Sequence, residues 1–301
     1  LPEDESAWDE MFVMFATASG NVRRNSLSDL VNVKANGKIA MKLTDGDRLV
    51  SARVCEAEQD VLLASLQGKA VRFPVTDVRV FKGRDSTGVR GMKLAGDDQL
   101  ISMSILHHVE VGTDEREAYL RYATQKRRLN GDGEEAADPE NAANGEISAE
   151  RLRELEDQEE LLLTVADDGF GKLTPAYEYR ITSRGTQGIA AMELARGKES
   201  AQMIAAFPVD SNDQVMVVTD GGQLIRCPVQ GIRIAGRNTR GVRLLRVADG
   251  ERVVSVAHLG EQDLDEAAAR AEGAGSNGEP GVENGTRSEE HTSELQSLSH
   301  I

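Results

Sequence analysis

Basic side chains recur at matched positions in this sequence. Arg24, Arg72 and Arg226 each lie four residues after a glycine that follows an apolar run, and Lys172 lies one position short of the same slot. Arginine and lysine neutralise phosphate groups and release condensed counterions, so cations at regular spacing suit the binding of duplex DNA. The alternative is a solvated or salt-bridged strand face, which contributes little.

Further basic residues extend these four positions into a possible cationic track. They are Arg23, Lys38, Lys42, Arg84, Arg90, Lys93, Arg184, Arg237, Arg240 and Arg243. Bending a duplex costs on the order of several kcal/mol, so many modest phosphate contacts must offset the deformation. Such binding needs no acid, base or nucleophile, and we predict no catalytic residue in this chain.

The basic residues lie within four copies of one repeating unit. Each copy opens with an apolar run that closes on a turn glycine, and Gly20, Gly68, Gly169 and Gly222 are separated by 48, 101 and 53 residues. The middle step equals one repeat plus an insert. Runs that close on glycine are typical of β-hairpins. Four short strands in a unit of this length indicate an all-β fold of propeller-like blades.

A second glycine in each copy opens another β-type run. These glycines are Gly37, Gly88, Gly188 and Gly241. None of the glycines forms a glycine-rich loop followed by Lys-Ser or Lys-Thr, so we assign them turn geometry rather than phosphate binding.

The charge distribution divides the chain into segments. The net charge of -16 is concentrated in residues 1–10, 107–160 and 260–301, whereas residues 11–106 and 161–259 are mildly basic. We predict the end of a preceding blade and two blades over 1–106, and two further blades over 161–260. Between them, 107–160 is predicted to be an acidic insert with helices over 114–129 and 149–160, an N-cap at Ser148, and a disordered linker.

Residues 261–301 are acidic and lack periodicity, which predicts a disordered tail. Within it, 287–301 resembles the translation of a sequencing adapter and is excluded from fold reasoning. The insert and the tail are either tethered polyanions that compete with DNA or solubilising linkers, and the sequence favours neither. The first residue is not methionine, and we expect further blades upstream of this chain.

Metal, disulfide and membrane functions find no support in the sequence. Cys55 and Cys227 have no partner at metal-binding spacing, and two cysteines in a chain of this length favour a reducing cytoplasm. The five histidines likewise lack the spacing of a metal site. No stretch is long and apolar enough to cross a bilayer, so we expect neither a metal nor a membrane partner.

Several motifs together resemble the C-terminal domains of bacterial DNA gyrase A subunits. The strongest runs from Ile234 to Val242, preceded by Val218–Gly222, and three weaker counterparts cover the other repeats. The resemblance extends over about residues 11–106 and 161–259. It implies a β-pinwheel of about six blades, four of them present here, in which neighbouring blades exchange strands.

The resemblance also implies a function and partners. Duplex DNA would wrap around the domain and support ATP-dependent negative supercoiling. The domain would work with the rest of the gyrase A subunit, in a heterotetramer with the gyrase B subunit. ATP and Mg would be held by other domains, so no cofactor is expected here, and the enzyme would act in the cytoplasm on the nucleoid.

One departure from the family pattern leaves alternatives open. The basic box Gln-Arg-Arg-Gly-Gly-Lys-Gly of the family's first blade is absent, and 125–128 in the insert is no substitute. The C-terminal domain of the related topoisomerase IV therefore remains an alternative, as does a propeller that serves as a protein-interaction scaffold.

Overall fold

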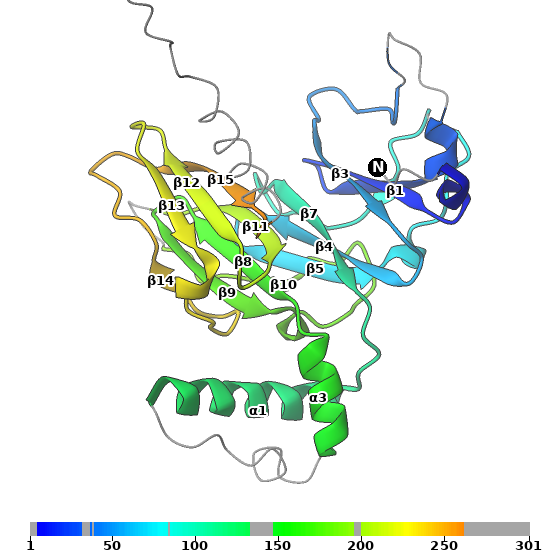
Figure 1. Ribbon diagram of the computed structural model, residues 1–301. Helices are drawn as coiled ribbons and strands as arrows, with labels where there is room; N and C mark the ends of the chain where they lie inside the picture. The colour runs from blue at the N-terminus through cyan, green and yellow to red at the C-terminus, as the bar shows by residue number, and fades with distance from the viewer. Residues whose placement is uncertain are drawn as a thin grey trace, which may run out of the picture. The chain divides into compact units, whose positions relative to one another are not determined.

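Hairpins built from the predicted apolar runs form four sheets in the computed structural model (Figure 1). The structure describes residues 5–31, 37, 39–83, 85–132, 147–195 and 200–261. The acidic tail from residue 262, the insert's linker over 133–146, and the basic residues Lys38 and Arg84 lie outside the described residues.

The first two repeats follow one another directly. A 3-10 helix, η1 (Glu5–Asp9), precedes β1 (Phe12–Thr17), β2 (Asn21–Ser26), η2 (Leu27–Leu30) and β3 (Leu49–Cys55). Repeat 2 contains β4 (Gln59–Ser65), β5 (Lys69–Pro74), η3 (Val75–Asp77), β6 (Val89–Arg90) and β7 (Leu100–His107).

The last two repeats have the same element order. Repeat 3 contains β8 (Leu161–Ala166), β9 (Phe170–Pro175), η4 (Ala176–Glu178), β10 (Ile189–Ala190) and β11 (Met203–Val209). Repeat 4 contains β12 (Gln214–Thr219), β13 (Leu224–Pro228), η5 (Val229–Gly231), β14 (Val242–Arg243) and β15 (Val253–Leu259).

Consecutive repeats exchange a short strand. The sheets have the orders β3-β1-β2-β6, β10-β5-β4-β7, β11-β8-β9-β14 and, within the described residues, β13-β12-β15. Thus β6 of repeat 2 pairs with β2 of repeat 1, and β10 and β14 likewise pair with the preceding repeat. The predicted all-β pinwheel of four-stranded blades with a helical insert is confirmed, including the strand exchange that the resemblance implied.

Close backbone contact explains the second glycine of repeats 2, 3 and 4, whereas a Cβ on Gly37 of repeat 1 would meet nothing within 4 Å. Gly188 has φ +72°, and a Cβ there would lie 2.3 Å from the carbonyl oxygen of Ala70 in the preceding sheet. Any larger residue would push β10 away from β5, so strand exchange itself requires glycine at this position.

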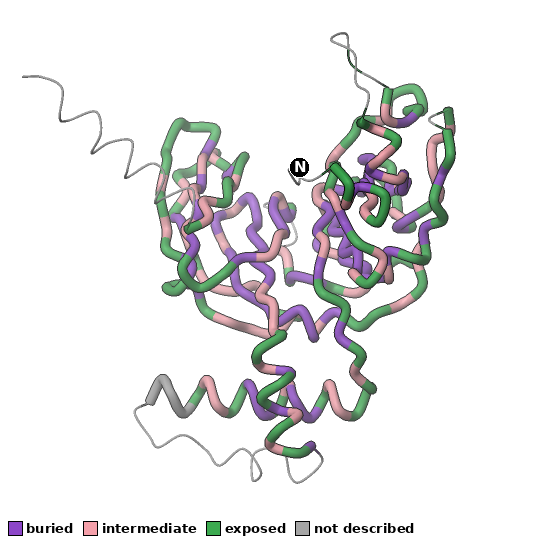
Figure 2. The backbone as a smooth tube through the Cα atoms, turned by 45° about the vertical axis from the view of Figure 1, so that its right-hand side comes forward, coloured by how far each residue is buried: buried purple, intermediate pink, exposed green. Residues whose placement is uncertain are grey.

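The exchange strand defines the outward edge of each of the first three sheets. At the opposite edge, β3, β7, β11 and β15 contact one another from sheet to sheet. Buried side chains from successive sheets form shared cores (Figure 2). Both strands and connections contribute to them, since Val78 and Met92 in connections share one core with Leu63 of β4. We call residues 78–93, 179–193 and 232–246, which lead from the 3-10 helices through the exchange strands, the exchange segments.

The insert forms a helical pair with its own small core. Helices α1 (Thr113–Asp132) and α3 (Ala149–Asp157) pack through Tyr119 and Leu155 onto Tyr177 of η4. The helices and the predicted N-cap are confirmed, because the Ser148 side chain accepts a hydrogen bond from the Arg151 N–H. Ion pairs such as Lys126–Glu156 and Arg127–Glu159 use part of the insert's acidic charge internally.

Candidate nucleic-acid interface

Four of the predicted DNA contacts are buried, which makes the prediction wrong for Arg23, Arg24, Arg72 and Lys172. The exposed fraction is 0% for Arg23 and Lys172, 4% for Arg72 and 7% for Arg24. A side chain enclosed to this degree cannot reach a phosphate outside the fold. Their charges are used inside the domain instead.

Arg72 connects repeat 2 to repeat 3. Its Nε donates to Oδ2 of the fully buried Asp60 at 2.8 Å, while Nη1 and Nη2 donate to the carbonyl oxygens of Ala176 and His107 at 3.1 and 2.7 Å. Asp60 also contacts Nδ1 of His108 at 2.8 Å. The guanidinium therefore holds the junction where the chain leaves for the insert and returns from it.

Arg72 occupies the position four residues after the turn glycine, which we call the slot. In every repeat the slot residue has a partner twelve residues earlier. The pairs are Phe12 with Arg24, Asp60 with Arg72, Leu161 with Leu173, and Gln214 with Arg226. The backbone carbonyl of the slot residue accepts an N–H from the following repeat at Arg24, Arg72 and Leu173. The regular spacing of these arginines thus reflects packing within and between blades.

Arg23 and Lys172 hold the exchange segments in place. Lys172 Nζ donates to the carbonyl oxygens of Gly236, Arg237 and Thr239 at 2.7 to 2.8 Å. Arg23 Nη1 donates to the Ser86 carbonyl oxygen at 2.6 Å in the equivalent loop. Both side chains therefore donate to carbonyl groups of the following repeat and tie its exchange segment to the preceding blade.

The buried ammonium of Lys172 predicts a pH-dependent stability. Burial lowers the pKa of Lys172 from 10.5 to about 8. Between these pH values the unfolded chain binds more protons than the folded chain, so a rise in pH favours folding. Relative to Lys172→Met, the wild-type free energy of unfolding should rise between pH 8 and 10.5, by at most about 1.4 kcal/mol per unit. Urea denaturation of both proteins across this range measures it, and parallel pH profiles would contradict it.

Three further predicted contacts are partly exposed but connect neighbouring repeats. Arg184 donates to the carbonyl oxygens of Asp77 and Arg90, each at 3.0 Å. Arg237 makes the equivalent bond to the Ala190 carbonyl oxygen at 3.2 Å. Arg240 pairs with Asp168 at 2.5 Å and stacks 3.7 Å from the centre of the Phe170 ring.

The remaining described contacts from the sequence are exposed. They are Lys42, Arg90, Lys93, Arg226 and Arg243. Arg90 and Arg243 lie on exchange strands β6 and β14, and Lys93 follows β6 by three residues. Their exposure is compatible with DNA contact, which stays a prediction.

Sequence reasoning missed a second row of cations, which we call the outer arginine row: Arg79, Arg180 and Arg233. All three are exposed and follow the 3-10 helices η3, η4 and η5 at the same position. The next residues, Val80, Ile181 and Ile234, form parallel bridges to the preceding repeat. Alternation along this extended backbone therefore turns each arginine away from the sheet.

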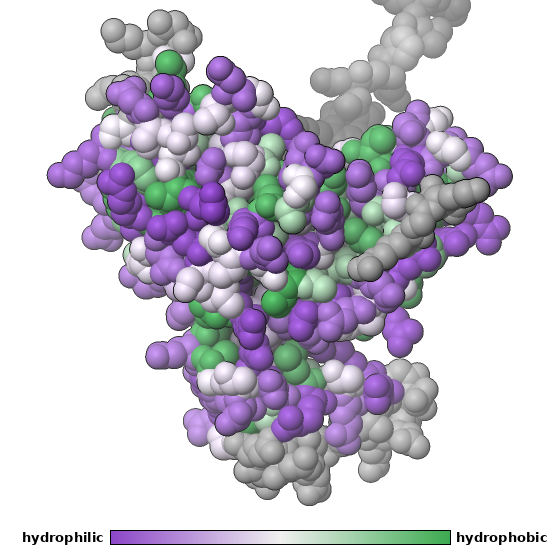
Figure 3. Space-filling model, turned by 180° about the vertical axis from the view of Figure 1, so that it is seen from behind, coloured by the Kyte–Doolittle hydropathy of each residue, from purple (hydrophilic) through white to green (hydrophobic). Residues whose placement is uncertain are grey.

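Each residue of the outer arginine row lies in an exchange segment, and two of these three segments are strongly basic. Exchange segment 78–93 contains five basic residues and one acidic residue, and 232–246 contains five basic residues and no acidic one. Segment 179–193 contains Arg180, Arg184 and Glu193 as its charged residues. Seen from behind, the surface over the sheets is largely hydrophilic with small apolar patches (Figure 3). The outward edges thus collect positive charge in a chain whose net charge is negative.

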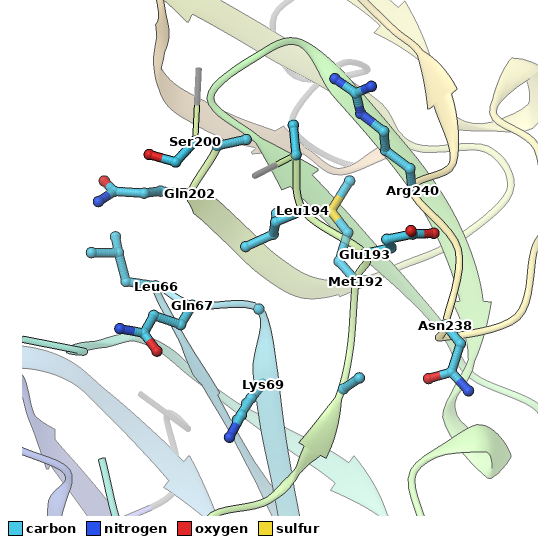
Figure 4. A pocket seen from close by; sticks show the side chains of 14 residues that line it. Leu66, Gln67, Lys69, Met192, Glu193, Leu194, Ser200, Gln202, Asn238 and Arg240 are labelled. Atoms are coloured by element: carbon cyan, nitrogen blue, oxygen red, sulfur yellow. The ribbon is translucent and has the colours of Figure 1, made fainter. Parts of the chain in front are cut away.

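A cavity of about 1060 Å³ lies beside the exchange strand β10 (Figure 4). Residues from three repeats line it, and its charged side chains are Lys69, Glu193 and Arg240. Arg240 is already paired with Asp168. Among the described lining residues, no nucleophile lies together with an acid–base pair, which is the arrangement that catalysis would need.

The part of the chain that the structure describes lacks two other kinds of site. In this part of the chain, no group of three or more His, Cys, Asp or Glu side chains is placed to hold a metal ion. Nor does it contain a helix long and apolar enough to cross a membrane.

Comparison with known proteins places the four repeats in one family model. The model described as the DNA gyrase C-terminal domain, beta-propeller, matches residues 12–56, 59–107, 160–209 and 213–258. Two curated relatives are named as DNA gyrase A subunits. The protein of Granulibacter bethesdensis is 49% identical over 85% of this chain, and that of Rickettsia bellii is 43% identical over 88%. The chain spans 28% and 29% of their lengths.

Solved structures share the fold. A DNA gyrase A C-terminal domain matches with a TM-score of 0.59 and 21% identity, covering 83% of this chain and 66% of that one. A C-terminal domain of DNA topoisomerase IV matches with a TM-score of 0.64 and 16% identity, covering 89% and 68%. At these identities the two matches establish the fold alone.

Proposed function

The chain belongs to the DNA gyrase C-terminal domain family, and on this premise we propose that it binds duplex DNA along its exchange segments and wraps the duplex around them. The observation that carries the proposal is the outer arginine row, which repeats one exposed cation on three consecutive outward edges. Phosphates that follow such a row would release counterions at each contact. Arg90, Lys93 and Arg243 add charge beside it.

In the whole protein, the domain would support ATP-dependent negative supercoiling by a type II topoisomerase. The remainder of the gyrase A subunit, together with the gyrase B subunit, would provide DNA cleavage and ATP hydrolysis, with ATP and Mg held in those parts. The domain itself contributes positioning of the duplex and needs no cofactor for it. The enzyme would act on the bacterial nucleoid in the cytoplasm.

Gyrase is preferred to topoisomerase IV because the curated relatives described above are gyrase A subunits. The shared fold does not separate the two enzymes, since a topoisomerase IV domain matches it as well. A protein-interaction scaffold would not require a repeated exposed arginine on each outward edge.

Ligation of nicked circular DNA in the presence of the chain tests this function. A duplex wrapped around the domain with one handedness should change its linking number on sealing, and the change should grow with protein concentration. Added salt should abolish it, because phosphate contacts weaken steeply with salt. Circles sealed with and without protein that have the same linking number would refute wrapping by this chain.

A further inference from the structure

A cavity of about 120 Å³ lies where the helical insert meets the exchange segment of repeat 3. One wall comes from the start of the insert and the other from repeat 3. The lining residues are Val109, Val111, Thr113 and Arg116 on the first wall, and Tyr177, Tyr179, Arg180 and Ile181 on the second. Its volume corresponds to about four water molecules at ~30 Å³ each, which leaves room for a phosphate group.

Positive charge dominates the lining of this cavity. Arg72, Arg116 and Arg180 line it, and none of the described lining residues carries a carboxylate. The Arg72 guanidinium is neutralised by Asp60, and each of its three nitrogens donates a hydrogen bond. The other two arginines are therefore the groups with capacity for a ligand.

Neither Arg116 nor Arg180 has a close carboxylate partner among the described residues. Among the described residues, the Arg180 side chain makes no hydrogen bond or ion pair, and it is exposed at the cavity mouth. Arg116 reaches Glu117 at 3.7 Å, and its Nε is buried without a hydrogen-bond partner. A buried guanidinium N–H without an acceptor is uncommon, and an oxyanion would satisfy it.

The nearest acidic residue on the first turn of α1 is directed elsewhere. Glu115 accepts a hydrogen bond from Arg151 Nε at 2.8 Å, and this bond lowers the pKa of the Glu115 carboxyl. Glu115 remains ionised on the α3 side of the helix, so it leaves Arg116 without a short carboxylate contact.

The cavity lies beside the exchange segment with the least positive charge. Segment 179–193 carries two arginines and Glu193, whereas the other two segments carry five basic residues each. The insert brings Arg116 to this position, next to Arg180 of the outer arginine row. A planar guanidinium pair matches the geometry of phosphate oxygens better than a single point charge does.

We propose that Arg116 and Arg180 form a phosphate-binding pocket, through which the insert supplies repeat 3 with a cation that its own exchange segment lacks. The ligand is a phosphate group, from the backbone of bound DNA or from free inorganic phosphate. For the DNA source the proposal rests on the proposed function of the exchange segments.

The test compares Arg116→Gln, Arg180→Gln and the double variant with Arg153→Gln in the full chain. Arg153 is exposed on α3, outside the cavity lining, and its replacement removes the same charge from the insert. Duplex affinity is measured by fluorescence anisotropy over a salt series, and inorganic phosphate binding by calorimetry. Near-ultraviolet circular dichroism checks folding, and the exposed Arg180 provides a variant without a packing defect.

Each pocket variant should reduce the slope of log affinity against log salt by about 0.9. The double variant should lose little more duplex affinity than either single variant, since both arginines hold the same phosphate. Saturable binding of inorganic phosphate that both pocket variants abolish would also support the pocket, with free phosphate as its ligand. The proposal is overturned if Arg116→Gln and Arg180→Gln match Arg153→Gln in both measurements.

Arg79→Gln in repeat 2 separates this inference from the proposed function. If Arg79→Gln and Arg180→Gln weaken duplex binding and Arg116→Gln does not, the outer arginine row is supported and the pocket is refuted. If Arg116→Gln and Arg180→Gln weaken binding and Arg79→Gln does not, the pocket is supported and the row is refuted.

Discussion

Replacing Arg72 with methionine should lower the free energy of unfolding by about 3–5 kcal/mol. The change leaves the fully buried Asp60 without its ion pair, and it removes donors from the carbonyl oxygens of Ala176 and His107. Methionine keeps the length of the stem, so the loss measures the guanidinium rather than a cavity. Urea denaturation at neutral pH gives the value, and Arg72→Met with Asp60→Leu should recover part of it.

Arg226 provides the matched control for Arg72. It occupies the same slot in repeat 4, but it is exposed and bonds to Gln214 rather than to a buried carboxylate. Arg226→Met should therefore cost less than about 0.5 kcal/mol, as surface substitutions usually do. If Arg72→Met and Arg226→Met lowered the free energy of unfolding equally, Arg72 would not make the buried contacts described above. A folded Arg72→Met chain of unchanged stability and weakened DNA affinity would restore the surface role predicted from the sequence.

The repeat was predictable from sequence, but the direction of its arginines was not. Glycine spacing and apolar runs depend on local turn chemistry. Because the same local signals recur in every copy, comparing the copies is enough to recognise the repeat. Whether an arginine in a strand faces a neighbouring blade depends on residues elsewhere in the fold. A signal was nevertheless present: the slot changes together with the residue twelve positions earlier, so that Leu173 accompanies Leu161 where Arg72 accompanies Asp60.

The outer arginine row was detectable in the same way. Arg79, Arg180 and Arg233 are separated by 101 and 53 residues, the same steps as the turn glycines Gly68, Gly169 and Gly222. Each arginine stands between two apolar or aromatic residues, the alternation of an extended chain with one face buried. The segment was overlooked because it forms an isolated bridge to the preceding sheet rather than a long strand.

Contacts between distant parts of the chain lay beyond sequence reasoning. The helices of the insert follow from local pattern and from the N-cap at Ser148. Their docking depends on Tyr119 meeting Tyr177 at a ring-centre distance of 5.1 Å, fifty-eight residues further along the chain. The phosphate pocket proposed above arises from that docking, so the pattern around Arg116 gave no sign of it.

Removing the outer arginine row should have the largest effect on DNA binding. In the triple variant Arg79→Gln, Arg180→Gln, Arg233→Gln, three exposed cations are lost from the outward edges. The change at Arg79 also removes a cation–π contact, because its guanidinium lies 4.1 Å from the centre of the Phe81 ring. A matched triple variant, Arg48→Gln, Arg53→Gln, Arg153→Gln, removes three exposed cations from other places. Arg53 lies on β3 at the inner edge, Arg48 immediately precedes that strand, and Arg153 lies on α3.

The salt dependence of duplex affinity in these two variants is the most direct test of the outer arginine row as the DNA-binding surface. The row variant should show a slope of log affinity against log salt shallower than wild type by about 2.7, the value for three lost phosphate contacts at ~0.9 each. The matched variant should keep a slope close to that of wild type. Equal slopes in the two triple variants would contradict the account, because the affinity would then follow total charge rather than the cations of the outward edge.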